Sequence, residues 1–262
     1  MNTPIRKEVL RLSSSILDKE YRYVPRKCVN MQIVRLKVAK LVAEEVLMQL
    51  PGQVFGALSG SDIILLTQVQ CAIYELDYYG ESVYCLDENV ISYLWNNIYA
   101  LIKEVPNHGL LGEELDRLKA YEEFERRIHV GKYPSYLEGL EALEFKCSDI
   151  TLLKKAAIIL SGNRSELSNF DKHRTIAIMR EVYDDVSDII EDIGTYNYNL
   201  IHALLKQGRT AGILGELITG SSEKNLSRIS LDINLSNAFV KEGMAVFPNG
   251  KRGIVSQCCE FR

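Results

Sequence analysis

The stretch REVYDDVSDIIED, Arg180 to Asp192, places six carboxylates within thirteen residues of a helical pattern. Because an α-helix turns about 100° per residue, Asp184, Asp188 and Asp192 form one winding stripe. No lysine or arginine is interleaved among them, so repulsion costs roughly a few tenths of a kcal/mol per pair. A hard cation such as Mg²⁺ or Mn²⁺ would relieve this repulsion through carboxylate oxygens. The alternative is a solvated acidic helix face.

A second acidic site lies in the apolar helical pattern DIILLTQVQCAIYELDYYGES, residues 62–82. It contains Glu75, Asp77 and Glu81, and the last two are four residues apart on one helix face. Buried acids are costly unless they are protonated, paired or metal-bound. No lysine or arginine occurs between positions 62 and 97 to pair with them. Two acidic stretches on facing helices therefore predict a cage for divalent metals, completed by water and a phosphate-bearing substrate.

The rest of the chain predicts a single all-α domain. Apolar residues recur at helical spacing through most of the sequence, while alternating β-type runs are few. No break is long or polar enough for an interdomain linker, so residues 1–246 are predicted to form one helical domain. Residues 247–262 contain Pro, Gly and adjacent cysteines and are predicted to be an irregular tail. The expected helices span residues 5–19, 31–50, 62–85, 87–104, 110–129, 134–161, 171–193, 196–219 and 223–241.

Composition excludes several classes of protein. The net charge of −4 gives no footprint for nucleic acid. The six cysteines show no zinc-ligand spacing, which favours free thiols in a reducing compartment. Neither a secretory signal nor a membrane-length apolar run is visible. We therefore expect a cytoplasmic protein without a membrane span.

Together, the two acidic motifs make the chain resemble the class I isoprenoid synthase superfamily, over roughly residues 63–199. YDDVSD, residues 183–188, is similar to the second aspartate-rich motif, DDxxD, and the same helix fits the terpene-synthase triad register. DYYGE, residues 77–81, is similar to the first motif with Tyr78 in place of its second acid. FKCSD, which contains Lys146, resembles the segment that places a basic residue on the diphosphate.

The resemblance implies a helical bundle of the terpene synthase type that ionises a prenyl diphosphate with Mg²⁺ or Mn²⁺ and then cyclises or rearranges the carbocation. It also implies a possible homodimer. Under this hypothesis Asp77, Asp184 and Asp188 are catalytic, and Lys146 and Arg127 bind diphosphate. The implied metal ligands are Asp77, Glu81, Asp184, Asp185, Asp188 and Asp192. Aromatic residues would line the pocket or belong to ordinary core: Tyr74, Tyr78, Tyr79, Trp95, Tyr99 and Tyr183.

Several alternatives stay open at this stage. A chain-elongating prenyl diphosphate synthase needs a second diphosphate site, and the upstream region RYVPRKCVNMQIVRLK is basic but lacks paired glycines, which favours cyclisation. A degenerate, non-catalytic member of the same fold would explain Tyr78. A plain helical interaction protein would leave both acidic stretches solvated or ion-paired. A di-iron bundle is set aside because no histidine has a glutamate three residues before it.

Overall fold

The computed structural model describes residues 4–20, 31–82, 86–129, 138, 142, 144–187 and 199. Within these residues the fold is helical and contains no strand, which confirms the all-α class. The α-helices are α1 (Pro4–Glu20), α2 (Met31–Ala39), α3 (Gly52–Ala57), α4 (Gly60–Ser82), α5 (Glu88–Ile102), α6 (Gly112–His129), α8 (Ser148–Leu160), α9 (Arg164–Ser168) and α10 (Phe170–Ser187). The π-helical segment η1 (Lys40–Val46) and the 3₁₀ turns η2 (Leu47–Gln49) and η3 (His108–Leu111) complete the set.

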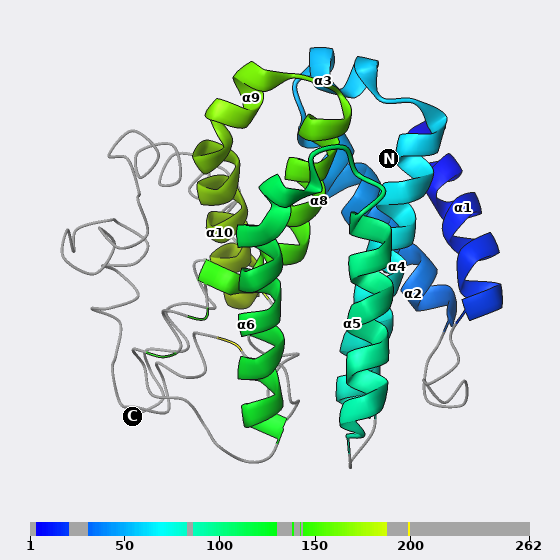
Figure 1. The fold of residues 1–262 in the computed structure, drawn as a ribbon, viewed down its shortest axis with the longest axis vertical. Coiled ribbons are helices and arrows are strands. Elements are labelled where there is room, and N and C mark those ends of the chain that lie inside the picture. Colours follow the sequence, from blue (N-terminus) through cyan, green and yellow to red (C-terminus); the bar gives the residue numbers. More distant parts are fainter. Residues whose placement is uncertain are drawn as a thin grey trace.

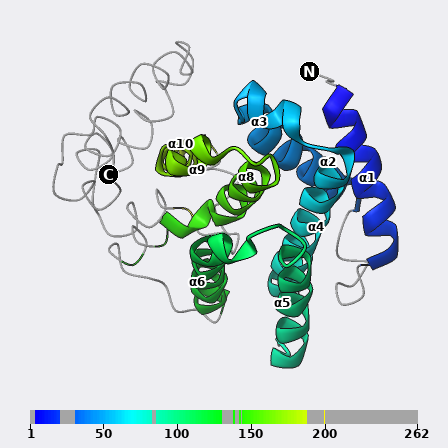
Figure 2. The same ribbon diagram turned by 45° about the horizontal axis from the view of Figure 1, so that its top comes forward.

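Helix α8 lies at the centre of this arrangement. It contacts α4, α6, α10 and η1, while α1 packs on α2 and α4 at the opposite edge (Figures 1 and 2). Its sequence SDITLLKKAAIIL is apolar on nearly every face, as expected for a helix enclosed by others. Leu152, Leu153, Ala157 and Ile158 are completely buried there. At about 1.5–3 kcal/mol for each large apolar side chain, this packing is a main source of the stability of the bundle.

Local sequence signals explain where several helices begin and end. The Asp87 carboxylate accepts a hydrogen bond from the Asn89 N–H at 2.8 Å and caps α5. The Asn163 side chain caps α9 in the same way through the Glu166 N–H. Helix α8 ends at Leu160, and Gly162, two residues later, has φ +70° and donates its N–H to the Ile159 carbonyl. This turn sends the chain back along α8 as α9 and α10.

Two expected helices differ from the structure. The helix expected over 134–161 is interrupted at Cys147, where Ser148 Oγ donates to the Phe145 carbonyl and a new helix, α8, begins. The helix expected over 31–50 widens into a π-helical segment at Lys40–Val46, which packs four apolar side chains inward: Leu41, Val42, Ala43 and Val46. Tertiary packing determines both the interruption at Cys147 and the π-helical segment, and the periodicity of apolar residues does not predict them.

Two expected breaks, at residues 51–61 and 161–170, contain the short helices α3 and α9. The helices expected at 196–219 and 223–241 and the tail at 247–262 lie outside the described residues. None of the helices in the described ranges is both long and apolar enough to cross a membrane.

Candidate functional site

Lys146 is the central cation of a polar cluster inside the bundle. It ends the short helical segment 144–146, so the break at Cys147 releases its side chain from the α8 register. Its ammonium contacts the carboxylate of Asp185 and lies 3.7 Å from Glu181 Oε2, both on α10. Burial alone would lower the pKa of Lys146, but the charges of Asp185 and then Glu181 outweigh it and the pKa lies above its ordinary value. Lys146 is therefore charged at neutral pH.

The two α10 carboxylates differ in environment. Asp185 has a side chain that is 1% exposed, and Glu181 is 17% exposed. Burial raises the pKa of Glu181 to about 7, although the Lys146 charge opposes this rise. The Asn199 amide donates to the Asp185 backbone carbonyl at 2.8 Å. One lysine thus faces two carboxylates, of which Glu181 titrates near neutrality.

Helix α4 supplies a second wall of this cluster. Burial raises the pKa of the Tyr74 hydroxyl, and the charges of Asp149 and Asp77 add to the effect. Gln70 Nε2 donates to Asp149 Oδ2 at 3.2 Å and ties α4 to the start of α8. Asp149 also accepts the Ile150 N–H at 2.6 Å. Burial nevertheless leaves the pKa of Asp149 above its ordinary value.

Helix α6 supplies a third wall. Burial raises the pKa of Tyr121, and Glu125, Asp185 and Glu181 contribute in that order. The charges of Asp185, Glu181 and Glu125 act on Lys146, the charge of Asp149 acts on Glu181, and the charge of Asp77 acts with Asp149 on Tyr74. We call this group the acid cluster: Asp77, Glu125, Lys146, Asp149, Glu181 and Asp185.

The predicted site residues fall into three groups. Asp77, Lys146 and Asp185 belong to the acid cluster, and Asp184 is close enough to raise the pKa of Glu181 although it is exposed. Arg127 is 54% exposed and contacts Glu138 at 3.6 Å and the Phe124 ring instead. Asp188, Asp192 and the side chain of Glu81 lie outside the described residues.

The side chains of the acid cluster that could donate oxygen ligands determine whether a metal ion can bind there. Within the described ranges, no group of three or more acid, histidine or cysteine side chains could hold a metal. Asp185 is engaged by Lys146 and Asp184 points to solvent, so these two do not form a pair of ligands on their own. A magnesium site at this position therefore depends on Glu81, Asp188 and Asp192.

Sequence reasoning missed Glu181, Asp149 and Gln70. The expected stripe began at Asp184, whereas the face of α10 that meets Lys146 carries Glu181 and Asp185, which are also four residues apart. Asp149 stands in the first turn of α8, where helix N-termini favour carboxylates. The sequence pattern did not predict the break at Cys147, and this break determines the direction of the Lys146 side chain.

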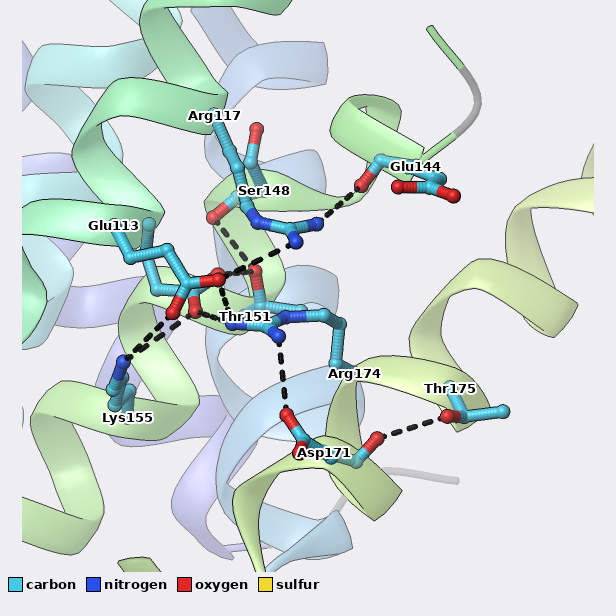
Figure 3. A network of polar contacts seen from close by, with 10 residues as sticks. Glu113, Arg117, Glu144, Ser148, Thr151, Lys155, Asp171, Arg174 and Thr175 are labelled. Atoms are coloured by element: carbon cyan, nitrogen blue, oxygen red, sulfur yellow. Dashed lines mark hydrogen bonds and ion pairs between the residues drawn. The ribbon is translucent and has the colours of Figure 1, made fainter. Parts of the chain in front are cut away.

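A buried ion network supports the other half of the same helices (Figure 3). Glu114, on α6, is fully buried and accepts hydrogen bonds from Arg174 of α10 and from Thr151 of α8, the latter at 2.8 Å. Lys155 lies 3.6 Å from the same carboxylate. Arg117 pairs with Glu113 at 3.4 Å and stacks over the ring of Phe145, the neighbour of Lys146. The network thus fixes α6, α8 and α10 relative to one another.

A fully buried lysine lies on α8 itself. Lys154 is 1% exposed and makes no hydrogen bond or ion pair with any residue that the structure describes. Burial, and then the Arg180 guanidinium, lower its pKa to about 8, although the Glu45 charge opposes this shift. Arg180 itself contacts Glu45 of η1 and donates to Gln49 at 2.9 Å. Lys154 is therefore destabilising when it is charged.

The aromatic residues divide between the cluster and the core. Tyr79 and Trp95 are 5% and 6% exposed and pack between α4 and α5, where the Tyr79 hydroxyl accepts the Asp87 N–H at 3.0 Å. Tyr74 is half-buried and belongs to the acid-cluster side of α4. Tyr78, at the position of the missing acid, lies under the Lys37 ammonium at 6.0 Å from its ring centre.

Comparisons with known proteins identify no relative of this chain. Neither the family models, nor the curated proteins, nor the solved structures gave a match to this chain. Functional inference therefore depends on the acid cluster and on the motifs in the sequence.

Proposed function

We propose that the chain binds a prenyl diphosphate and ionises it, after which the allylic carbocation cyclises or rearranges within the helical bundle. The observation that carries this proposal is the contact of Lys146 with the carboxylates of Asp185 and Glu181 on α10. Asp77 of α4 belongs to the other motif and acts on Tyr74 at the edge of the same acid cluster. Asp77, Lys146 and Asp185 carry the resemblance to class I isoprenoid synthases. A lysine surrounded by excess acid is suited to exchange its carboxylate partners for an anionic substrate delivered with cations.

Each residue has a defined role in this proposal. Lys146 would bind the diphosphate with its ammonium, because the charge is maintained at neutral pH. When the carbon–oxygen bond breaks, the electron pair leaves with the diphosphate, and Lys146 stabilises that leaving group. The tyrosine and aliphatic side chains beyond it would exclude water from the cation.

A divalent cation is part of the same proposal. Mg²⁺ or Mn²⁺ would be held by carboxylates of the two motifs and would supply positive charge to the departing diphosphate. Asp184 is exposed and Asp77 is half-buried, so both are accessible to a cation entering with the substrate. The remaining ligands of the proposed site are Glu81, Asp185, Asp188 and Asp192.

A substrate panel tests the function. The protein is incubated with Mg²⁺ and geranyl, farnesyl or geranylgeranyl diphosphate, and inorganic diphosphate and organic products are measured. We expect diphosphate release that is abolished in Asp77→Ala and Asp184→Ala, with helicity unchanged. Asp116→Ala, an exposed acid on α6, is the matched control and should retain full activity. The absence of diphosphate release with every substrate would contradict the proposal, as would retained activity in both motif variants.

Tyr78 favours a second candidate, a non-catalytic member of the same fold that binds the diphosphate without ionising it. The residue is half-buried and lies beside Lys37, in place of an acid that the first motif otherwise supplies. Metal-dependent binding of a non-hydrolysable prenyl diphosphate analogue, without turnover of the substrate itself, is the expected result for this candidate. A longer diphosphate formed only with added isopentenyl diphosphate would indicate chain elongation instead.

A further inference from the structure

The positive charge of the chain is concentrated in its first forty residues. Residues 1–40 contain ten lysines and arginines but only three acids and carry a net charge of +7, whereas residues 41–262 carry −11. Within residues 1–40 the structure describes α1 and α2, which pack on each other at the edge of the bundle away from α6 and α10 (Figures 1 and 2). Charge gathered on one edge produces a positive potential there although the whole chain is negative. This edge therefore attracts anionic surfaces.

The solvent-facing side of α2 carries exposed aliphatic side chains beside lysines. Ile33 and Leu36 are 48% and 42% exposed. Lys37 is exposed as well, and so is Lys40, which follows α2 directly as the first residue of η1. Because their spacing is i, i+3, i+4 and i+7, the four residues share one side of the helix, and we call them the outer face of α2. The side chains on the opposite side are completely buried: Val34, Val38 and Ala39.

Helix α1 adds positive charge next to this face. Arg6 Nη1 lies 3.0 Å from Glu44 Oε1 of η1, which joins the start of α1 to the segment that continues α2. Lys7, the neighbour of Arg6, is exposed. The contact therefore brings Lys7 to the same end of the helix pair as Lys40.

Exposed aliphatic side chains between lysines suit a lipid surface better than other anionic partners. Lysine is depleted at protein–protein interfaces. Contacts with the phosphates of a nucleic acid use the basic groups but leave aliphatic side chains in water. At an anionic bilayer both kinds of side chain are used, because the aliphatic groups enter the boundary of the acyl chains while the ammonium groups stay among the headgroups.

We propose that the outer face of α2 docks the protein on the surface of a bilayer that contains anionic lipid. Ile33 and Leu36 enter the acyl boundary, and Lys37 and Lys40 bind the headgroups. The helix lies along the bilayer surface and does not cross it, since its other side is packed in the bundle. This inference does not depend on the proposed function, because the docking requires no prenyl diphosphate.

Vesicle co-sedimentation with the full chain tests the inference. Vesicles of phosphatidylcholine alone are compared with vesicles that contain about 30% phosphatidylserine. We expect binding to the second kind that is at least about tenfold tighter than to the first. Raising NaCl from about 0.1 M to about 0.5 M should weaken this binding at least tenfold, because the exposed charges are then screened. No substrate is present, so a failure here leaves the proposed function untouched.

Two double variants separate the contributions of charge and apolar contact. Lys37→Gln with Lys40→Gln should weaken binding to the anionic vesicles about 25-fold, at roughly fivefold for each lysine. Ile33→Ser with Leu36→Ser should weaken it about tenfold, because the two aliphatic side chains no longer enter the acyl boundary. All four side chains are exposed, so circular dichroism should show unchanged helicity in both variants.

Matched controls change exposed residues away from α2. Lys103→Gln with Lys119→Gln removes two exposed lysines, and Leu110→Ser removes an aliphatic side chain that is 48% exposed. Both controls should bind within about twofold of the wild type. Equal binding to the two kinds of vesicle, no binding to either, or wild-type binding by both α2 variants would overturn the inference. Binding of single-stranded DNA without binding of anionic vesicles would overturn it in favour of a nucleic-acid partner.

Discussion

Replacing Lys154 with methionine should stabilise the protein, although the side chain is buried in the central helix. Lys154 is 1% exposed, and its pKa is lowered from the ordinary 10.5 to about 8, first by burial and then by Arg180. The folded protein binds fewer protons than the unfolded chain between these two values, so stability rises with pH across this window. Below pH 8 the full penalty is present, and the pKa difference corresponds to about 3 kcal/mol. Methionine has a similar volume and carries no charge.

Urea unfolding followed by circular dichroism at pH 7 and pH 10.5 measures this effect. At pH 7 we expect the free energy of unfolding to rise by up to about 3 kcal/mol in Lys154→Met, or about 6–12 °C in Tm. At pH 10.5 most of the difference should disappear, because the unfolded lysine also loses its proton. Lys119→Met, an exposed lysine on α6, should change stability by less than about 0.5 kcal/mol at either pH. A Lys154→Met protein that is less stable than wild type at pH 7 would refute the reasoning, since it would mean that the ammonium has a stabilising partner.

Three further predictions address the site and the fold. Lys146→Met leaves the buried Asp185 without its cation and should lower the free energy of unfolding by about 3–5 kcal/mol at pH 8. The loss should be smaller at pH 5.5, because Glu181, with a pKa of about 7, is then protonated. Urea unfolding at both pH values measures the difference. Glu114→Gln should lower the free energy of unfolding by about 3–5 kcal/mol, because Arg174 and Lys155 lose a fully buried partner. Glu113→Gln changes a side chain that is 55% exposed and should lower the free energy of unfolding by less than about 1 kcal/mol. Equal shifts in Tm for the two variants would contradict this. Asp87→Ala removes the cap of α5 and should lower the free energy of unfolding by about 1 kcal/mol, with no change for Asp116→Ala.

Most of the described fold could be predicted from periodicity. The long helices α1, α4, α5 and α6 lie within a few residues of their expected limits, because each has apolar residues at helical spacing and a recognisable boundary. Helix α10 begins one residue before its expected start, and its expected end at 193 lies outside the described residues. Sequence periodicity does not contain the interruption at Cys147, since EALEFKCSDITLL continues the helical pattern on both sides. The interruption depends on the hydroxyl of Ser148 and on packing against α6 and α10. The spacing of apolar residues along the sequence therefore does not predict an interruption that depends on tertiary contacts.

The candidate site could be predicted only in part. Asp77, Lys146 and Asp185 were identified from their motifs, and the structure pairs Lys146 with Asp185. Their proposed roles stay predictions. The predicted stripe of α10 began at Asp184, which is exposed, whereas the residues that meet Lys146 are Glu181 and Asp185. Neighbouring residues on a helix differ in direction by about 100°, so Asp184 and Asp185 face different surroundings although they are adjacent in the sequence. Gln70 and Asp149 carry no motif and become visible only through their contact.

Cys147 gives the protein an internal reporter. Its thiol is completely buried between Lys146 and Ser148, and burial raises its pKa, so an alkylating reagent can reach it only when this junction opens. A ligand that binds the closed form slows that labelling by the factor 1 + [L]/Kd. Mass spectrometry of the peptide containing Cys147 would then measure affinities without turnover, and candidate ligands could be screened before any product is known.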